Sequence, residues 1–205
     1  MSIIGALHAA ARAYAAAGIP VFPIIPGDKI PPSGTNSFYS ATTDRDQVDR
    51  WWSDNPNFNI AIRLDAMPWG VIDIEPGGFE QWDALVKEYG AVPHTYSVVT
   101  PRGGRHLYYE GVLPTSVKKI AKGIHEHVGG IDTRGTGGYV LVPPSVVKGK
   151  TYAPEDPAAP MPDWINVAPM PAWLPKHPAL LKPENVAKAA AFGAPVPAIH
   201  LDGLL

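Results

Sequence analysis

The chain has 205 residues, 45% of them hydrophobic and 18% charged, and these values indicate one folded domain with a hydrophobic core. It contains no cysteine, which excludes disulfides and cysteine-based zinc or iron–sulfur sites and fits a cytoplasmic protein. The formal net charge of −2 argues against a general polyanion binder, and no apolar run is long enough to cross a membrane. We therefore expect any contact with nucleic acid to use a local basic patch.

The first half of the chain is predicted to alternate helices with strands. Hydrophobic spacing predicts an amphipathic helix over residues 3–17 that ends at Gly18. A strand over residues 19–25 follows, and Pro23 indicates either a sheet edge or an irregularity in the strand. Thr43 is the expected N-cap of the second helix. Two further strands and a third helix are expected at residues 59–64, 71–75 and 78–89.

The second half is predicted to be mostly strands. The expected strands are residues 95–100, 105–110, 131–133 and 139–142. The first two would form a hairpin, and the last two a second strand pair joined by a glycine-rich turn. Residues 153–176 read as an extended strap, followed by a short helix and a weakly ordered tail. Three helices with mainly antiparallel strands indicate an α+β fold.

Two carboxylates one residue apart, Asp73 and Glu75, are the most informative feature of the sequence. Alternate residues of a strand share a face, so both would lie side by side near the end of the strand that Pro76 terminates. Adjacent carboxylates repel, and a folded protein seldom tolerates such a pair without a cation. The pair is a candidate site for Mg²⁺ or Mn²⁺ against phosphate oxygens. The alternative is an exposed strand end with salt bridges to nearby arginines.

A second acidic segment supplies the third candidate ligand, Asp132. It lies in a short apolar strand among glycines, where an unpaired acid would be costly. The alternative is that Asp132 only forms a turn. Arg134 shares the face of Asp132, and a cation there suits a triphosphate ligand. Its alternative is a salt bridge to Asp73 or Glu75.

Candidate phosphate contacts surround a glycine-rich turn and an N-terminal loop. Arg105 and His106 follow two glycines, which let the backbone approach a phosphate closely. Strand alternation puts these two on opposite faces, and we expect His106 to face the cleft and Arg105 to act from the turn or bind template backbone. Lys29 could reach a phosphate or remain a surface lysine. His125 and His127 have zinc-like spacing but are expected to be solvated loop residues.

Taken in order, these segments resemble the bifunctional DNA primase/polymerase (prim–pol) domain of the archaeo-eukaryotic primase superfamily, found in plasmid and phage replication proteins. The resemblance is collinear over about residues 5–175. The matching stretches are residues 14–23, 27–31, 41–44, 51–60, 71–75, 100–109 and 131–145. Residues 61–65 depart from the glycine-containing segment of many relatives, which puts the wall of the nucleotide site in question.

The resemblance implies an RRM-like catalytic core with a mainly antiparallel sheet, a companion α/β subdomain and a cleft between them. It implies that residues 1–175 form the catalytic domain and 176–205 a C-terminal helix and tail or linker. The implied metal ligands, for two Mg²⁺ or Mn²⁺ ions, are Asp73, Glu75 and Asp132. The implied nucleotide contacts are His106, Arg134, Lys29 and Arg105.

The implied function is template-directed nucleotidyl transfer, as a DNA primase, a DNA polymerase or both. The implied partners are a single-stranded DNA template, a primer, dNTP or NTP, and a replicative helicase in cis or in trans. The expected basic surface for the template backbone comprises Arg102, Lys118, Lys119 and Lys122. Two alternatives stay open: a non-catalytic module that binds single-stranded DNA or nucleotide and recruits a helicase, and a metal-dependent nuclease.

Overall fold

The computed structural model describes residues 3–116, 121–122, 130–163, 165–178, 180, 187 and 190–191. The helices are α1 (Ile3–Ala16), α2 (Arg45–Asp54) and α3 (Phe79–Tyr89), with short 3-10 helices η1 (Ser37–Ser40), η2 (Leu64–Ala66) and η3 (Leu174–Lys176). Several expectations fall outside this part of the chain. They concern Lys118, Lys119, the side chain of Lys122, His125, His127 and most of the expected tail.

The strands form two main sheets. The smaller has the antiparallel order β1-β2-β8, from β1 (Val21–Ile24), β2 (Asn59–Arg63) and β8 (Tyr139–Leu141). The larger has the order β11-β4-β5-β3-β7-β6, and β12 pairs in parallel with β5. Its strands are β3 (Trp69–Ile74), β4 (Ser97–Val99), β5 (Arg105–Glu110), β6 (Ala121–Lys122), β7 (Gly130–Arg134), β11 (Ala153–Pro154) and β12 (Ala168–Pro169). A separate hairpin joins β9 (Val146–Val147) to β10 (Lys150–Thr151).

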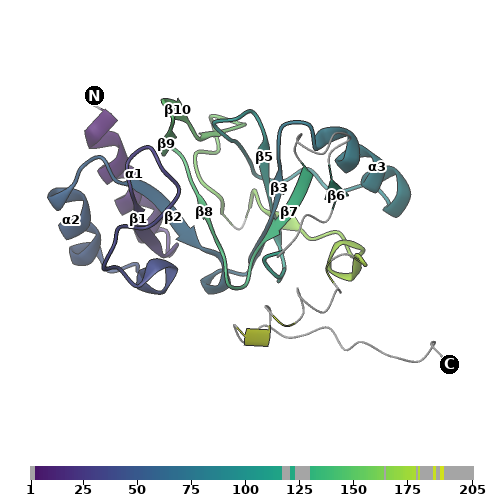
Figure 1. Ribbon diagram of the computed structural model, residues 1–205, viewed down its shortest axis with the longest axis horizontal. Helices are drawn as coiled ribbons and strands as arrows, with labels where there is room; N and C mark the ends of the chain where they lie inside the picture. Colours follow the sequence, from purple (N-terminus) through teal and green to yellow (C-terminus); the bar gives the residue numbers. More distant parts are fainter. Residues whose placement is uncertain are drawn as a thin grey trace.

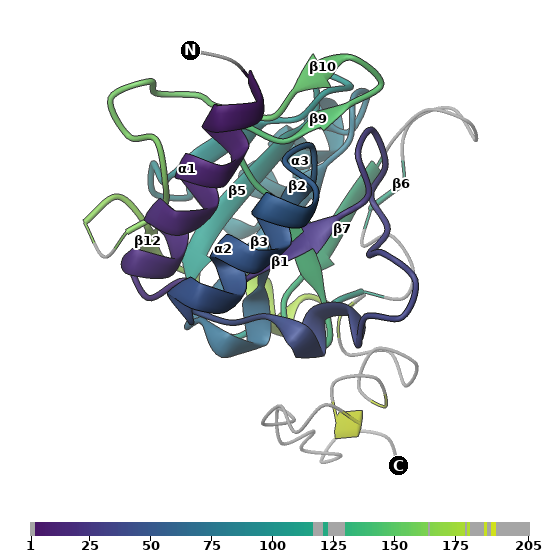
Figure 2. The ribbon, with the colours of Figure 1, turned by 90° about the vertical axis from the view of Figure 1, so that its left-hand side faces the viewer.

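The two sheets lie side by side with helices on their outer sides (Figure 1). Helices α1 and α2 lie against β1 and β2 (Figure 2), and α3 lies against β7 and β6. The first hydrophobic core includes Tyr14, Phe22, Trp52, Ile60 and Ile62. The second includes Ile72, Ile74, Trp82, Leu85 and Ile131. The fold is therefore mixed α/β with mostly antiparallel sheets, in line with the strand-rich order of the sequence.

Strand β3 lies at the centre of the larger sheet and has two different faces. Ile72 and Ile74 are buried in the core beside α3, whereas Val71 is buried in the core of the smaller sheet. Asp73 shares the face of Val71 because alternate residues of a strand point the same way. The predicted alternation is confirmed, and it directs Asp73 toward the space between the two sheets.

The expected pairing of the two strands around the glycine-rich turn at residues 135–138 is wrong. Strand β7 pairs with β3 in the larger sheet, and β8 pairs with β2 in the smaller sheet. The turn packs closely against the backbone of Leu113, since a Cβ on Gly135 would lie 1.9 Å from the Leu113 carbonyl oxygen. The chain therefore crosses from one sheet to the other at this turn instead of forming a hairpin.

The sequence predicts Thr43 as the N-cap of α2, but the N-cap in the structure is Asp44. The Asp44 carboxylate accepts hydrogen bonds from the backbone N–H groups of Asp46 at 2.8 Å and Gln47 at 3.1 Å. These are donors that no carbonyl inside the helix can satisfy. The Asp44 N–H donates to the side-chain hydroxyl of Thr42 at 3.0 Å, and this hydrogen bond orients the cap.

The segment that starts at residue 153 is extended, as expected for a strap. It pairs with β4 through β11 and with β5 through β12, and it ends at η3. Leu174 and Leu180 are buried in the core beside α3. No helix among the described residues has the length and apolar character that a membrane span requires.

Candidate functional site

The register of the larger sheet places three of the candidate side chains in one row. Asp73 on β3 lies directly opposite His106 on β5 and Asp132 on β7. Residues directly opposed in antiparallel strands share a face and have neighbouring Cβ atoms. Asp132 therefore lies beside Asp73, the position expected for it from the sequence, although the two are 59 residues apart in the chain, the difference between positions 132 and 73.

Arg134 reaches both of these carboxylates from β7. Its Nη2 atom is 3.3 Å from Oδ2 of Asp73 and 3.5 Å from Oδ2 of Asp132. Two acids on adjacent strands repel, and the guanidinium between them offsets that repulsion. Of the two alternatives left open by the sequence, the structure contains the ion pair of Arg134 with Asp73.

His106 is buried beside Asp73, with 6% of its surface exposed. Its Nε2 atom is 3.6 Å from Oδ1 of Asp73, and its Nδ1 atom has no hydrogen-bond partner among the described residues. Burial lowers the pKa of His106 from 6.5, because the charged imidazolium loses its hydration. Asp73 opposes that shift, while Lys29 and Arg134 add to it. The imidazole is therefore neutral at pH 7, and its buried Nδ1 is left without a hydrogen-bond partner among the described residues.

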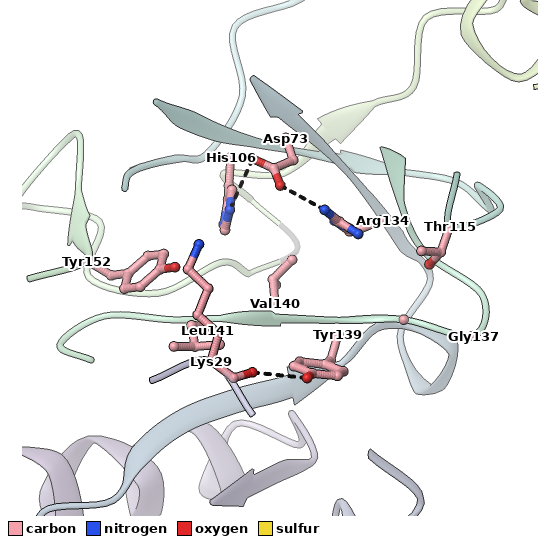
Figure 3. A pocket seen from close by; sticks show the side chains of 11 residues that line it. Lys29, Asp73, His106, Thr115, Arg134, Gly137, Tyr139, Val140, Leu141 and Tyr152 are labelled. Carbon is pink, nitrogen blue, oxygen red and sulfur yellow. Dashed lines mark hydrogen bonds and ion pairs between the residues drawn. The ribbon is translucent and has the colours of Figure 1, made fainter. Parts of the chain in front are cut away.

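A cavity of about 320 Å³ lies between the two sheets (Figure 3). The larger sheet contributes Asp73, His106 and Arg134 to its wall, and β8 contributes residues 139–141. The Lys29 side chain points across the cavity toward His106 (Figure 3). The Tyr139 hydroxyl donates to the Lys29 carbonyl at 3.0 Å, which holds the loop that carries this lysine. An acid, an imidazole and two cations thus face one hollow between the sheets.

Glu75 lies just beyond the end of β3. Its N–H donates to the Gly130 carbonyl at 2.9 Å, and its carbonyl accepts from the Gly78 N–H at 2.8 Å. Its side chain is half-buried. Over the described chain, the cavity wall includes Asp73 but neither Glu75 nor Asp132. The shared role of the three acids stays a prediction.

Arg105 lies on the opposite face of β5 from His106, as strand alternation predicts. It is opposite Ile74 in the sheet register, and its guanidinium lies 5.7 Å from the centre of the Phe79 ring. Its Nη2 atom is 2.6 Å from Oε1 of Glu155, at the start of the strap. This contact anchors the strap to the larger sheet and keeps Arg105 out of the cavity wall.

The glycine at position 104 explains how the β4–β5 turn approaches the end of β3. A Cβ there would lie 2.3 Å from the carbonyl oxygen of Ile74. Any side chain would push the turn away from β3 and shift His106, two residues later. Gly104 therefore serves close packing of backbone on backbone, whereas Gly103 supplies a positive φ of 87° in the turn. The approach to phosphate inferred from the sequence stays a prediction.

The wall residues that were not sequence candidates include two tyrosines, Tyr139 and Tyr152. Tyr139 directly follows the glycine-rich turn, and this position in the sequence could have marked it as a candidate wall residue. Tyr152 is buried, and its ring centre lies 5.8 Å from that of His106. Burial raises the pKa of the Tyr152 hydroxyl, which keeps it neutral. No local pattern marks Tyr152, because it reaches His106 only through tertiary packing.

Among the residues described, no group of three or more His, Cys, Asp or Glu side chains is placed to hold a metal ion. Asp73 and Asp132 nevertheless fit a divalent cation. Carboxylate oxygens are the ligands that Mg²⁺ prefers. Both carboxylates also approach one nitrogen of Arg134, so their position already accommodates positive charge.

A mixed α/β domain whose cavity wall combines a carboxylate with an imidazole, a guanidinium and a lysine is suited to phosphate-bearing ligands. The family model for the N-terminal domain of bifunctional DNA primase/polymerases, Prim-Pol, matches residues 11–173. The chain belongs to the Prim-Pol family, which confirms the resemblance found in the sequence. Enzymes of this family are primase/polymerase nucleotidyltransferases that use DNA and nucleotides and are generally metal-dependent. A search of curated protein sequences finds no match.

Proposed function

We propose that this chain is a template-directed nucleotidyltransferase, a DNA primase or polymerase of phage or plasmid replication. The observation that carries the proposal is the row formed by Asp132, Asp73 and His106 across three adjacent strands. Two residues of this row, Asp73 and His106, line a cavity whose wall also includes Lys29 and Arg134. Membership of the Prim-Pol family supports the same activity.

The residues divide into two roles. Asp73, Glu75 and Asp132 would hold two Mg²⁺ or Mn²⁺ ions through their carboxylate oxygens. Bound cations of this kind supply Lewis acidity, which favours ionisation of a 3′-hydroxyl and departure of pyrophosphate. Because Arg134 contacts two of the acids, metal binding would release its guanidinium toward the triphosphate.

The neutral His106 would donate or accept one hydrogen bond at the phosphates from its place in the cavity wall. Lys29, which points across the cavity, would neutralise charge on the same group. Arg105 is placed on the other face, so any contact with DNA would come from the outer side of the turn.

We interpret the larger sheet with α3 as an RRM-like core, because β3 lies between β5 and β7 and the β4–β5 hairpin flanks it. The smaller sheet with α1 and α2 would be the companion subdomain, and the cavity between the sheets the cleft. On this interpretation residues 1–175 contain the catalytic domain, and residues 176–205 form a C-terminal extension. A helicase would act with it in cis or in trans.

The decisive test is primer extension and primer-free synthesis by Asp73→Asn and by the double variant Asp73→Asn/Glu75→Gln, with Mg²⁺ and with Mn²⁺. Both amides keep the side-chain shape but remove the charge that binds a cation. We expect synthesis to fall by at least about 100-fold, the effect of losing one strong electrostatic contact to the transition state. Asp83→Asn, an exposed acid on α3, is the matched control. Normal synthesis by a folded double variant would exclude the proposed role of these acids.

A non-catalytic nucleotide-binding module is the second candidate, and one observation favours it. Arg134 contacts Asp73 and Asp132 together, so a permanent ion pair could neutralise the acids without any metal. The same assays distinguish the two candidates: tight binding of DNA or dNTP without incorporation would favour the module. Degradation of labelled DNA without incorporation would instead favour a nuclease.

A further inference from the structure

A second depression, which we call the basic groove, adjoins the cavity. It has a volume of about 710 Å³, and its wall includes Lys29, Arg102, Lys148 and Lys150. Lys29 belongs to the wall of both hollows, so the two lie next to each other. The wall also includes Pro76, the residue after Glu75. The basic groove thus leads from the surface to the end of β3 that carries the acidic residues.

The charge of the basic groove differs from that of the whole chain. Four cationic side chains line it against one acid, Asp28, whereas the chain has a net charge of −2. The four cations are all exposed. Within the described chain, no carboxylate forms an ion pair with Arg102, Lys148 or Lys150. Their charges are therefore available to an external anion.

Three separate segments bring these cations together. Lys29 lies in the loop after β1, Arg102 in the β4–β5 turn, and the other two in the β9–β10 hairpin. A bridge between Gly27 and Val147 fastens this hairpin to the loop of Lys29. Figure 1 shows the hairpin at one end of the two sheets. The basic groove is therefore a product of the tertiary fold.

The tip of the hairpin contains a lysine in a backbone conformation that rarely suits it. Lys148 has φ 51° and Gly149 has φ 74°, the pair of positive angles typical of a type I′ turn. Asn-Gly is the favoured sequence for that turn, and a lysine with positive φ is uncommon. Local conformation therefore does not explain the lysine at position 148, whereas a charge at the edge of the basic groove does.

We propose that the basic groove binds the phosphate backbone of a single-stranded polynucleotide and guides it to the cavity. This inference rests on the proposed function for the identity of the strand as template or primer. A polynucleotide fits better than one free triphosphate, because the cations come from three segments around a hollow larger than the 320 Å³ cavity. Contacts to phosphate alone would give little sequence preference.

The test compares Lys148→Asn/Lys150→Gln with wild type in anisotropy titrations of a fluorescein-labelled oligothymidine at several salt concentrations. Each lost phosphate contact lowers the slope of log K against log salt by about 0.7 for single strands, so the double variant should lose roughly 1.4. Lys148→Asn should melt no lower than wild type, because Asn-Gly favours the turn. This stability measurement separates loss of charge from loss of fold.

Three controls complete the design. Lys148→Arg keeps the charge and should bind the oligonucleotide like wild type. Lys87→Gln/Lys176→Gln removes two exposed lysines of α3 and η3 and should leave the slope unchanged. Binding of a labelled dATP with Mn²⁺ should be within about twofold of wild type in the groove variant, because Asp73, His106 and Arg134 are intact.

An unchanged salt slope in the double variant would overturn the inference, as would loss of dATP binding with oligonucleotide binding retained. Neither result depends on catalysis, so the proposed function would stand or fall separately. Repeating the titration in the Asp73→Asn background makes the separation explicit. If that variant synthesised DNA normally while the groove variants lost DNA binding, the proposed catalyst would fail and the basic groove would remain.

Discussion

Asp73 lies between the buried imidazole of His106 and the partly exposed guanidinium of Arg134, and these two neighbours differ in charge and burial. The Arg134 guanidinium has 34% of its side chain exposed, so its pairing with Asp73 is screened by water. His106 is buried, and its charged form is disfavoured there. The carboxylate is therefore balanced by one permanent cation and one neutral group.

The titration of His106 gives a prediction about stability. In the unfolded chain the residue titrates near 6.5, while burial lowers its pKa in the fold. Below pH 6.5 the unfolded state takes up a proton more readily than the folded state, so folding becomes less favourable. The contribution of neutral His106 is complete above pH 6.5 and is lost as pH falls through the lower pKa of the folded state.

We therefore expect wild type to lose more stability than His106→Gln between about pH 7.5 and about pH 5. The measurement is urea unfolding in EDTA, which keeps divalent cations from the neighbouring acids. Comparing the change with pH in the two proteins removes the contribution of the other six histidines, the remainder of the seven in the chain. Parallel pH profiles would contradict the buried, neutral imidazole.

At the scale of elements, strand β3 shows how much a local pattern can predict. The alternation of apolar and acidic residues correctly assigned Ile72 and Ile74 to a core and Asp73 to the other face. The boundaries of α3 and its end at Gly90, which has φ 114°, also follow from local residues. Local residues do not predict which strands pair, because β3 pairs with β7, which lies far from it in the sequence.

The N-terminus of α2 offers a direct test between two candidate caps. Asp44→Ala removes the acceptor of two backbone N–H bonds and should lower the free energy of unfolding by about 1 kcal/mol. Thr43→Ala, at the position favoured from the sequence, should change it by less than about 0.5 kcal/mol because the residue is exposed. Urea unfolding of both variants measures the difference. If the two variants lowered the free energy of unfolding equally, Asp44 would not be the stabilising N-cap.

At the scale of the whole molecule, the crossing between the two sheets sets the dimensions of the cavity. The turn at residues 135–138 leaves β7, contacts the segment after β5 and enters β8. The Thr136 N–H donates to the Leu113 carbonyl at 2.8 Å, and Thr115 from the same segment lines the cavity. Backbone packing at this turn therefore fixes the relative positions of Arg134 and Tyr139, which both line the cavity.

Gly135→Ala should disrupt this crossing. Its Cβ would lie 1.9 Å from the Leu113 carbonyl oxygen, in place of the hydrogen bond from Thr136. We expect the free energy of unfolding to fall by about 3 kcal/mol, at the upper end of the range for overpacking. Gly5→Ala is the matched control, since no atom lies within 4 Å of its Cβ position in α1, and it should gain up to about 1 kcal/mol. Thermal and urea unfolding that leave Gly135→Ala as stable as wild type would contradict this packing.

The sequence by itself determined most helices and strands, the face on which Asp73 lies, and the family, because residue periodicity and ordered motifs are local properties of the chain. Only the tertiary structure decided that β7 and β8 belong to different sheets, that Arg134 contacts two acids, and that Lys148 and Lys150 lie beside Arg102. These outcomes depend on which distant segments pack together. Periodicity within one segment carries no information about that choice.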